Sequence, residues 1–252
     1  MDALLEHLYR YPVKGLSAEA LSSVELTSGN TIPFDRRYAI ENGPIGFDPA
    51  VPKYFKKPHF LMLMRDERMA TLQSRFDART CVLSLSHSGN EVATGNLETE
   101  VGRKHIEDFL QEYFAKELKG RPKILSAPDH SFCDVDMRVV SIINLATLNE
   151  LSSTAGQYVH PLRFRANLYV SGWPSWHEFS LVGQEIWVGA TKLRVVKRTM
   201  RCAATSVNPL TAERDINIPG LIARTYRHPD CGVYAEVVSD GRIAIGDRVR
   251  AA

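Results

Sequence analysis

Long apolar runs, a secretion leader and a one-sided charge are all missing from this chain of 252 residues. No run reaches the roughly 18 apolar residues of a membrane-spanning helix, and residues 1–11 lack the apolar core of a signal peptide. The 31 Lys and Arg residues nearly balance the 29 Asp and Glu residues, so no basic field indicates a nucleic-acid partner. We expect a cytoplasmic protein with no membrane span and no bound nucleic acid.

Paired cysteines are missing as well. The chain has four cysteines, which lie far apart and form no CxxC pair: Cys81, Cys133, Cys202 and Cys231. Because nothing in the sequence points to secretion, this spacing favours free thiols over a disulfide framework.

Common nucleotide-binding and hydrolase motifs are also absent. The sequence holds no Walker loop, no G-x-G-x-x-G and no G-x-S-x-G, so these functions have no support. What is present is an average soluble composition, with 44% hydrophobic and 24% charged residues. A chain of this length can bury one large core or two smaller ones.

The first third of the sequence predicts short strands. Runs of strand length occur at residues 4–11, 21–26, 35–41, 60–64, 70–73 and 82–86, with turn-forming residues between them. Short strands at this spacing favour an antiparallel barrel or sandwich over β-α-β units.

A helix is predicted over residues 101–119. Its apolar side chains recur at helical offsets: Ile106, Phe109, Leu110, Tyr113, Phe114 and Leu118. Gly120 and Pro122 supply the stop. We place a domain boundary here, which gives domains of residues 1–120 and 121–252, with residues 121–139 as a crossing segment.

The second half predicts one more helix and further strands. Asn144 is a suitable N-cap for a helix at residues 145–152. Strands are predicted at residues 168–171, 184–188, 193–198, 232–238 and 242–246, with hairpin turns at residues 189–191 and 239–241. The fold class is therefore β-rich α+β, with two barrel-like domains and a few helices.

The most informative cysteine is Cys202. It directly follows a predicted strand and lies close to Lys197, Arg198 and Arg201. A thiolate is the reactive and metal-binding form of cysteine, and neighbouring cations stabilise it. The alternative is that Cys202 is a small buried core residue and that these cations face water.

A second group of candidate residues is basic. Guanidinium groups present planar, forked donors that suit phosphate, and Lys adds a point charge. The candidates are Lys14, Arg36, Arg37, Arg163 and Arg165. If their loops converge near Cys202, they form an anion-binding pocket beside a thiolate; taken singly, each of these residue types lies more often on a solvated face.

Two further groups point to metals only weakly. Asp134 and Asp136 resemble a hard-metal pair, but two carboxylates without further ligands usually belong to a solvated loop. His228 and Cys231 have no second pair at zinc-like spacing, so no zinc site is predicted.

In order along the chain, these motifs resemble the MOSC family, named after the C-terminal domain of molybdenum cofactor sulfurase, with its N-terminal β-barrel partner. The N-terminal part of the resemblance consists of Tyr11-Pro-Val-Lys14-Gly15, Gly29-Asn30 and Asp35-Arg36-Arg37-Tyr38. The C-terminal part consists of Arg163-Phe-Arg165-Ala-Asn167, Gly183, Trp187-Val-Gly189, Met200-Arg201-Cys202, Thr205, Asn208-Pro209 and Ile245-Gly246-Asp247. The family includes the mitochondrial amidoxime-reducing component and YcbX-type reductases.

This resemblance implies a molybdenum cofactor, Mo-molybdopterin, with Cys202 as the metal ligand and the catalytic residue. It assigns cofactor binding to six further residues: Lys14, Arg36, Asn144, Arg165, Asn167 and Arg201. A soft thiolate suits a transition metal. The implied function is an oxidoreductase that reduces N-hydroxylated or other N-oxygenated small molecules.

The sequence departs from some relatives in two places. Gly15 stands where some reductases have Ser, so a side-chain contact to the cofactor is missing. The sequence also holds no cysteine-rich ferredoxin domain, so we expect electrons from a separate reductase or ferredoxin-like protein.

Two other functions stay open. Cys202 could accept sulfur as a persulfide, or the protein could carry and deliver the cofactor, because an exposed thiolate serves either role. A third reading is a β-barrel interaction module that has lost cofactor binding.

Overall fold

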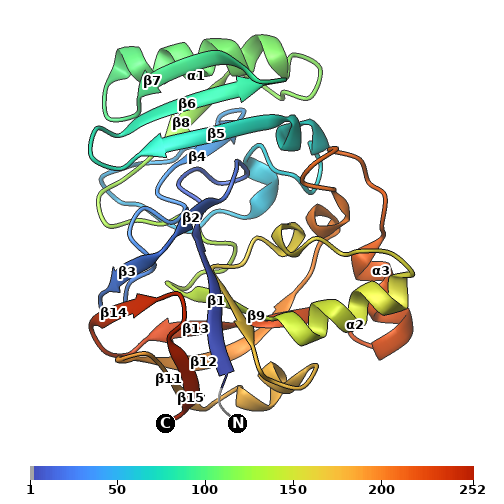
Figure 1. Cartoon of the computed structure of the whole chain (residues 1–252). Coiled ribbons are helices and arrows are strands. Elements are labelled where there is room, and N and C mark those ends of the chain that lie inside the picture. Colours follow the sequence, from blue (N-terminus) through green and yellow to red (C-terminus); the bar gives the residue numbers. More distant parts are fainter. Residues whose placement is uncertain (1–2) are drawn as a thin grey trace.

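Seven strands in the lower part of the computed structural model close into a barrel (Figure 1). The structure describes residues 3–252. In spatial order the barrel strands are β10 (Leu168–Ser171), β9 (Val140–Asn144), β13 (Asp230–Val237), β12 (Thr191–Met200), β11 (Glu185–Val188), β15 (Arg248–Ala251) and β1 (Ala3–Arg10). Pairing of β1 with β10 closes the ring, and β9–β10 is the parallel pair in it.

The barrel core follows from alternation along the strands. In β12, Thr191, Leu193 and Val195 point inward and are buried, while Arg194 between them is exposed. The barrel interior is filled mainly by Val, Leu, Ile and Ala side chains from all seven strands. It is therefore a packed core, and the candidate site must lie outside it.

A second lobe lies above the barrel in Figure 1. Its sheet consists of β5 (Leu72–Asp77), β6 (Val82–His87) and β7 (Asn90–Asn96), and α1 (Glu100–Tyr113) packs against β7. Beside this sheet, β4 (Ala39–Asn42) pairs with β8 (Pro122–Leu125). Ile106 and Leu110 of α1 are fully buried in the core of this lobe.

Strand pairing crosses the proposed division near residue 120. β1 belongs to the first 120 residues but pairs with β10 and β15 of the barrel. β2 (Glu19–Leu21) pairs with β1, and β3 (Ser23–Leu26) pairs with β14 (Gly241–Ala244). The division into residues 1–120 and 121–252 stays a proposal about the order of domains along the sequence. In space, the N-terminal strand β1 completes the barrel of the C-terminal half.

Two more α-helices lie beside the barrel: α2 (Leu145–Ala155) and α3 (Ile218–Tyr226). The predicted cap of α2 is confirmed, since the Asn144 side chain accepts a hydrogen bond from the Ala146 amide. Sequence analysis missed α3, although Asn217 caps it and Pro219 stands in its first turn. Short 3₁₀ turns complete the fold: η1 (Lys57–His59), η2 (Glu67–Thr71), η3 (Pro161–Phe164), η4 (His177–Leu181) and η5 (Ala203–Ser206).

The predicted β-rich α+β class is confirmed, and several predicted elements need correction. The helix predicted to residue 119 ends at Tyr113, because Phe114 already leaves the helical conformation. Residues 60–64 form no strand, only a single bridge between Phe60 and Glu41. Residues 239–241 do not close a hairpin, since β13 and β14 pair with other strands. The crossing segment at 121–139 contains β8.

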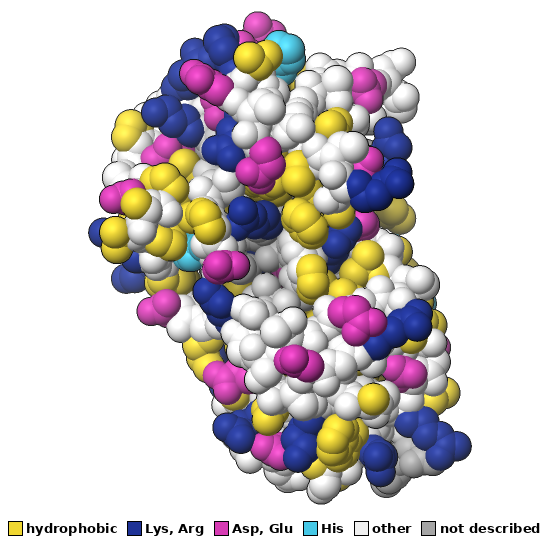
Figure 2. Space-filling model, turned by 90° about the vertical axis from the view of Figure 1, so that its left-hand side faces the viewer, with side chains coloured by type: hydrophobic (Ala, Val, Ile, Leu, Met, Phe, Trp, Pro, Cys, Tyr) yellow, Lys and Arg dark blue, Asp and Glu magenta, His cyan; other side chains and the backbone are white. Residues whose placement is uncertain are grey.

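Charge is mixed on the surface. On the face drawn in Figure 2, Lys and Arg side chains alternate with Asp and Glu rather than gathering in one patch. Within residues 3–252, no helix has both the length and the apolar character that a membrane crossing requires.

Candidate functional site

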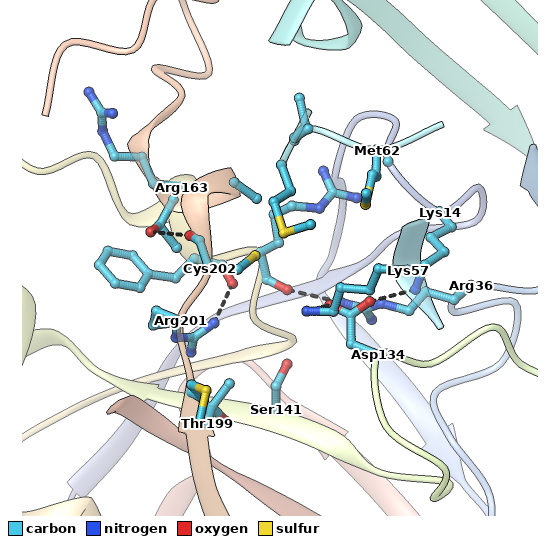
Figure 3. Close-up of a pocket in the computed structure, with 18 of the residues that line it drawn as sticks. Lys14, Arg36, Lys57, Met62, Asp134, Ser141, Arg163, Thr199, Arg201 and Cys202 are labelled. Carbon is cyan, nitrogen blue, oxygen red and sulfur yellow. Dashed lines mark hydrogen bonds and ion pairs between the residues drawn. The ribbon is translucent and has the colours of Figure 1, made fainter. Parts of the chain in front are cut away.

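A cavity lies where loops of the upper lobe meet the end of β12. Cys202 and five basic residues singled out from the sequence line it together, namely Lys14, Arg36, Arg163, Arg165 and Arg201, whereas the candidate Arg37 does not line it. In the view of Figure 3, Arg163 and Arg201 lie on one side of Cys202, and Lys57, Asp134 and Arg36 lie on the other. The predicted convergence of basic side chains on one thiol is thus present in the fold.

The position of Cys202 follows from the end of β12. This strand has register shifts between Arg198 and Met200, and the chain then turns into η5 with Cys202 as its N-cap residue. The Cys202 carbonyl accepts hydrogen bonds from the amide and the hydroxyl of Thr205, at 3.1 and 2.9 Å. The backbone is therefore fixed, while the thiol lines the cavity and stays partly exposed.

The other three cysteines do not line this cavity. All four are free thiols, as predicted. Burial raises the pKa of Cys231 to about 12, and burial also raises the pKa of Cys133. These two groups therefore stay protonated at neutral pH, and Cys202 is the thiol that the fold presents to the cavity.

Asp134 joins the two lysines of the cavity. Its carboxylate binds Lys14 through one oxygen and Lys57 through the other, the latter at 3.0 Å. Burial would raise the pKa of Asp134, but Lys14, Lys57 and Arg36 hold it far below its usual value. Asp134 is therefore paired with cations of the cavity although it is partly exposed, whereas Asp136 is exposed.

Lys57 was missed in the sequence, since it lies in a long loop without periodicity. The one available signal is the run Lys53-Tyr-Phe-Lys56-Lys57, which concentrates positive charge. Burial would lower the pKa of Lys57, but Asp134 and Cys202 raise it above its usual value. Lys57 therefore stays charged and adds one cation to the wall of the cavity.

Two arginines of the site stack on one aromatic ring. The guanidinium of Arg36 lies 5.1 Å and that of Arg165 lies 4.3 Å from the centre of the Tyr11 ring. Arg36 also pairs with Asp35 and donates to the Arg165 carbonyl at 3.1 Å. Both cations are thus held in place before any ligand binds.

Three buried polar atoms of the cavity residues have no hydrogen-bond partner within the described part of the chain. They are Nε of Arg163, Nη2 of Arg201 and Oγ1 of Thr199. A buried donor without a partner costs about 1–3 kcal/mol, so such groups are rare unless a ligand or water satisfies them. All three atoms belong to residues that line this one cavity.

The remaining atoms of the two arginines are well fixed. Arg163 donates to the Ser206 carbonyl at 3.1 Å and pairs with Asp215 at 2.7 Å. Arg201 donates to the carbonyls of Cys231 and Phe164, at 2.7 and 2.9 Å. The unpartnered nitrogens therefore belong to rigid side chains, which is the arrangement of a preformed binding site.

Asn144 and Asn167 lie outside the cavity. Asn144 caps α2 and donates to the Pro174 carbonyl and the Glu178 carboxylate. Asn167 accepts hydrogen bonds from the amide and hydroxyl of Ser141, at 3.0 and 2.8 Å. Since Ser141 lines the cavity, Asn167 can act on the site through it, and direct cofactor contacts of both asparagines stay predictions.

Gly15 has a structural reason to be glycine. Its φ is +91°, and a Cβ there would come within 2.7 Å of the Met69 side chain and 3.1 Å of the Leu61 carbonyl. The Ser found in some relatives would be strained at this position. The missing side-chain contact is therefore a consequence of local packing.

The site holds no cluster for a hard metal. Among residues 3–252, no group of three or more His, Cys, Asp or Glu side chains could bind an ion. What the site offers is one thiol among six cations and one carboxylate. This donor set suits a large anionic ligand, including one that carries a soft metal.

Two family models together match most of the chain. Residues 2–121 match the family model described as the MOSC N-terminal beta barrel domain, and residues 128–250 match the MOSC domain. Mitochondrial amidoxime reducing component 2 from Macaca fascicularis is 25% identical over 281 residues, which cover 96% of this chain and 81% of that protein.

Two solved structures are also similar. The YUAD protein from Bacillus subtilis is 16% identical, with a TM-score of 0.48, and the match covers 100% of this chain and 96% of that one. YiiM from Geobacillus stearothermophilus is 15% identical, with a TM-score of 0.37, over 45% of this chain and 53% of that one.

Proposed function

The chain belongs to the MOSC family, with a MOSC N-terminal β-barrel domain before a MOSC domain, and on this premise we propose that it is a molybdenum-cofactor-dependent reductase of N-oxygenated compounds. One observation carries the proposal: Cys202 shares a cavity with rigid cations that have unpartnered buried donors. The name of the macaque relative, which calls it an amidoxime reducing component, supports the choice of substrate class.

The residues present fit the cofactor. Molybdopterin carries a phosphate and a dithiolene, so it needs cations and hydrogen-bond donors on one side and a soft ligand for the metal on the other. Lys14, Arg36, Arg165 and Arg201 would hold the anionic part. The Cys202 thiolate would bind the metal.

The overall reaction balances as R–NHOH plus two electrons and two protons giving R–NH₂ plus water. When bound, the cofactor supplies the two-electron redox chemistry. The chain's own residues anchor and orient it: Cys202 through the thiolate, and Asp134 by fixing the ammonium groups of Lys14 and Lys57. Because the carboxylate offsets part of the positive charge, the site stays folded when no anion is bound.

Electrons would come from a separate protein. The sequence has no cysteine-rich ferredoxin motif, and its four cysteines are free thiols. We propose a reductase or ferredoxin-like donor, together with a small-molecule substrate.

The test is turnover of benzamidoxime by protein purified from a host that makes the cofactor, with reduced methyl viologen as the donor. We expect benzamidine formation that depends on bound molybdenum. Protein that carries a full complement of cofactor but gives no product with benzamidoxime, acetamidoxime or hydroxylamine would contradict the reductase function and favour a sulfur or cofactor carrier.

A further inference from the structure

A second cavity, of about 170 Å³, adjoins the candidate site. The two share part of their walls, namely Gly15, Leu63, Arg163, Arg165 and Ala204. Ala204 belongs to η5, the turn that Cys202 caps. The second cavity therefore lies directly behind the loop that carries the thiol.

The unshared wall of this cavity is apolar. Its large side chains are Leu16, Met69, Leu72, Leu162, Val207 and Leu210. We call the space bounded by these six residues and the shared wall the apolar chamber. Leu210 is 78% exposed, so the chamber has one wall at the surface of the molecule.

The two hydroxyl groups of the chamber are already used, and its charged side chains, Arg163 and Arg165, both stand on the shared wall. The Ser17 hydroxyl donates to the Leu72 carbonyl at 3.4 Å, and the Tyr11 hydroxyl donates to the Ala166 carbonyl at 3.1 Å. Arg163 has an unpartnered Nε, and Arg165 donates to the Leu16 carbonyl at 2.7 Å through Nη1. The chamber is thus apolar except for the wall that it shares with the Cys202 cavity, where both arginines stand.

This distribution of polar groups distinguishes between the possible occupants. A pterin carries donors and acceptors around its rings, and most of them would be buried in the chamber without partners, at a cost for each. A hydrocarbon group loses nothing there and gains from removal of its surface from water. An occupant with an apolar body and one polar end facing Arg163 and Arg165 fits both parts of the wall.

We propose that the apolar chamber is a substrate subsite that takes the alkyl or aryl group of the N-oxygenated compound, while the N–O group reaches the cavity of Cys202. This assignment rests on the proposed function. The assignment predicts a higher kcat/KM for substrates with a large apolar group than for small polar ones. The difference comes from tighter binding and not from a faster chemical step.

The test fills the chamber from its unshared wall. Ala70 lines the chamber and does not line the Cys202 cavity, so Ala70→Phe reduces the space available to an apolar group. The matched control is Ala20→Phe, since Ala20 is an exposed residue of β2 outside both cavities. Leu210→Asp is a second variant that leaves the core intact, because Leu210 is exposed.

Benzamidoxime and acetamidoxime are the two substrates compared, with reduced methyl viologen as the donor. We expect Ala70→Phe and Leu210→Asp to lower kcat/KM for benzamidoxime at least 10-fold, mainly by raising KM, with less than a 2-fold change for acetamidoxime. Ala20→Phe should leave both values unchanged. An equal loss of kcat/KM for both substrates would overturn the assignment. Loss of pterin from Ala70→Phe would also overturn it, because the chamber would then hold the cofactor.

A binding measurement separates failure of this inference from failure of the proposed function. Benzamide is the probe, and its binding to the wild-type protein is followed by saturation-transfer NMR in the absence of any donor. We expect a signal in the wild type and in Ala20→Phe that is lost in Ala70→Phe. If no amidoxime is reduced but this pattern holds, the reductase function fails and the chamber stands as a ligand site; if benzamide does not bind the wild type, the chamber assignment fails.

Discussion

Lys57 Nζ lies 3.0 Å from a carboxylate oxygen of Asp134, and this ion pair connects two loops that line the candidate site. The second oxygen of Asp134 binds Lys14, whose nitrogen also donates to the Phe132 carbonyl at 2.8 Å. Burial lowers the pKa of Lys14, and Asp134 opposes this effect. One carboxylate thus keeps two cations in place at the site.

We predict that Asp134→Asn destabilises the protein by about 1–2 kcal/mol at pH 7. Breaking a buried ion pair costs more than this, but the Asp134 side chain is 34% exposed and solvent screens part of the loss. The free energy of unfolding in urea measures the change. Asp108→Asn is the control, because Asp108 makes its ion pairs with Lys104 and Arg121 on the exposed surface, and it should change stability much less.

The same ion pairs predict a dependence of stability on pH. The native pKa of Asp134 is below the value of about 3.9 in an unfolded chain, so the carboxylate stabilises the fold fully above about pH 5. This contribution is lost as the pH falls further, because the unfolded state takes up the proton first. The difference in free energy of unfolding between wild type and Asp134→Asn should therefore shrink as the pH falls from about 5 to about 2. A difference that grows on acidification would contradict the stabilising role of the Asp134 ion pairs.

Gly232 sets the position of Arg201. Its φ is +74°, and a Cβ there would lie 2.5 Å from the Ile142 carbonyl and 3.1 Å from Nη2 of Arg201. We predict that Gly232→Ala destabilises the protein by clearly more than the roughly 1–2 kcal/mol that a left-handed backbone costs, and that it reduces bound pterin. The control is Gly29→Ala, since Gly29 has a φ of +73° but no neighbouring atom within 4 Å, so it should show the backbone cost alone and keep its pterin.

Arg201→Lys tests the guanidinium geometry. An ammonium group keeps the charge but cannot donate to the Cys231 and Phe164 carbonyls while pointing a third donor at the ligand. We predict about 10-fold or greater loss of pterin retained after dialysis, with the fold unchanged by circular dichroism. Arg194→Lys is the control, since Arg194 pairs with Glu185 on the surface; similar losses in both variants would contradict a specific role for Arg201.

Helices and strands were predictable from the sequence where interactions within one short segment determine its structure. The cap of α2 was read correctly, because Asn144 and the apolar periodicity after it lie in one short stretch. β10 also occurs at the predicted residues 168–171. Boundaries that depend on packing were not predictable: the apolar pattern of α1 continues past Tyr113, but the chain there turns to pack Phe114 and Leu118.

Partners far apart in the sequence could not be predicted from pattern alone. Nothing in residues 3–10 indicates that they close a barrel with residues 168–171 and 248–251. The same holds for the pairing of Asp134 with Lys57, since both lie in loops and each alone resembles a solvated charge. The sequence predicted Cys202 and five cations of its cavity, while the roles of Asp134 and Lys57 required the fold.

The most direct test of the central claim is the molybdenum and pterin content of the wild type beside Cys202→Ser, both purified from a host that makes the cofactor. Cys81→Ser is the control, because Cys81 packs in the upper lobe and does not line the cavity. We predict near-stoichiometric molybdenum and pterin in the wild type and in Cys81→Ser, and loss of molybdenum in a folded Cys202→Ser. Equal molybdenum in all three proteins, or none in the wild type when a known molybdoenzyme is loaded in the same host, would contradict Cys202 as the metal ligand.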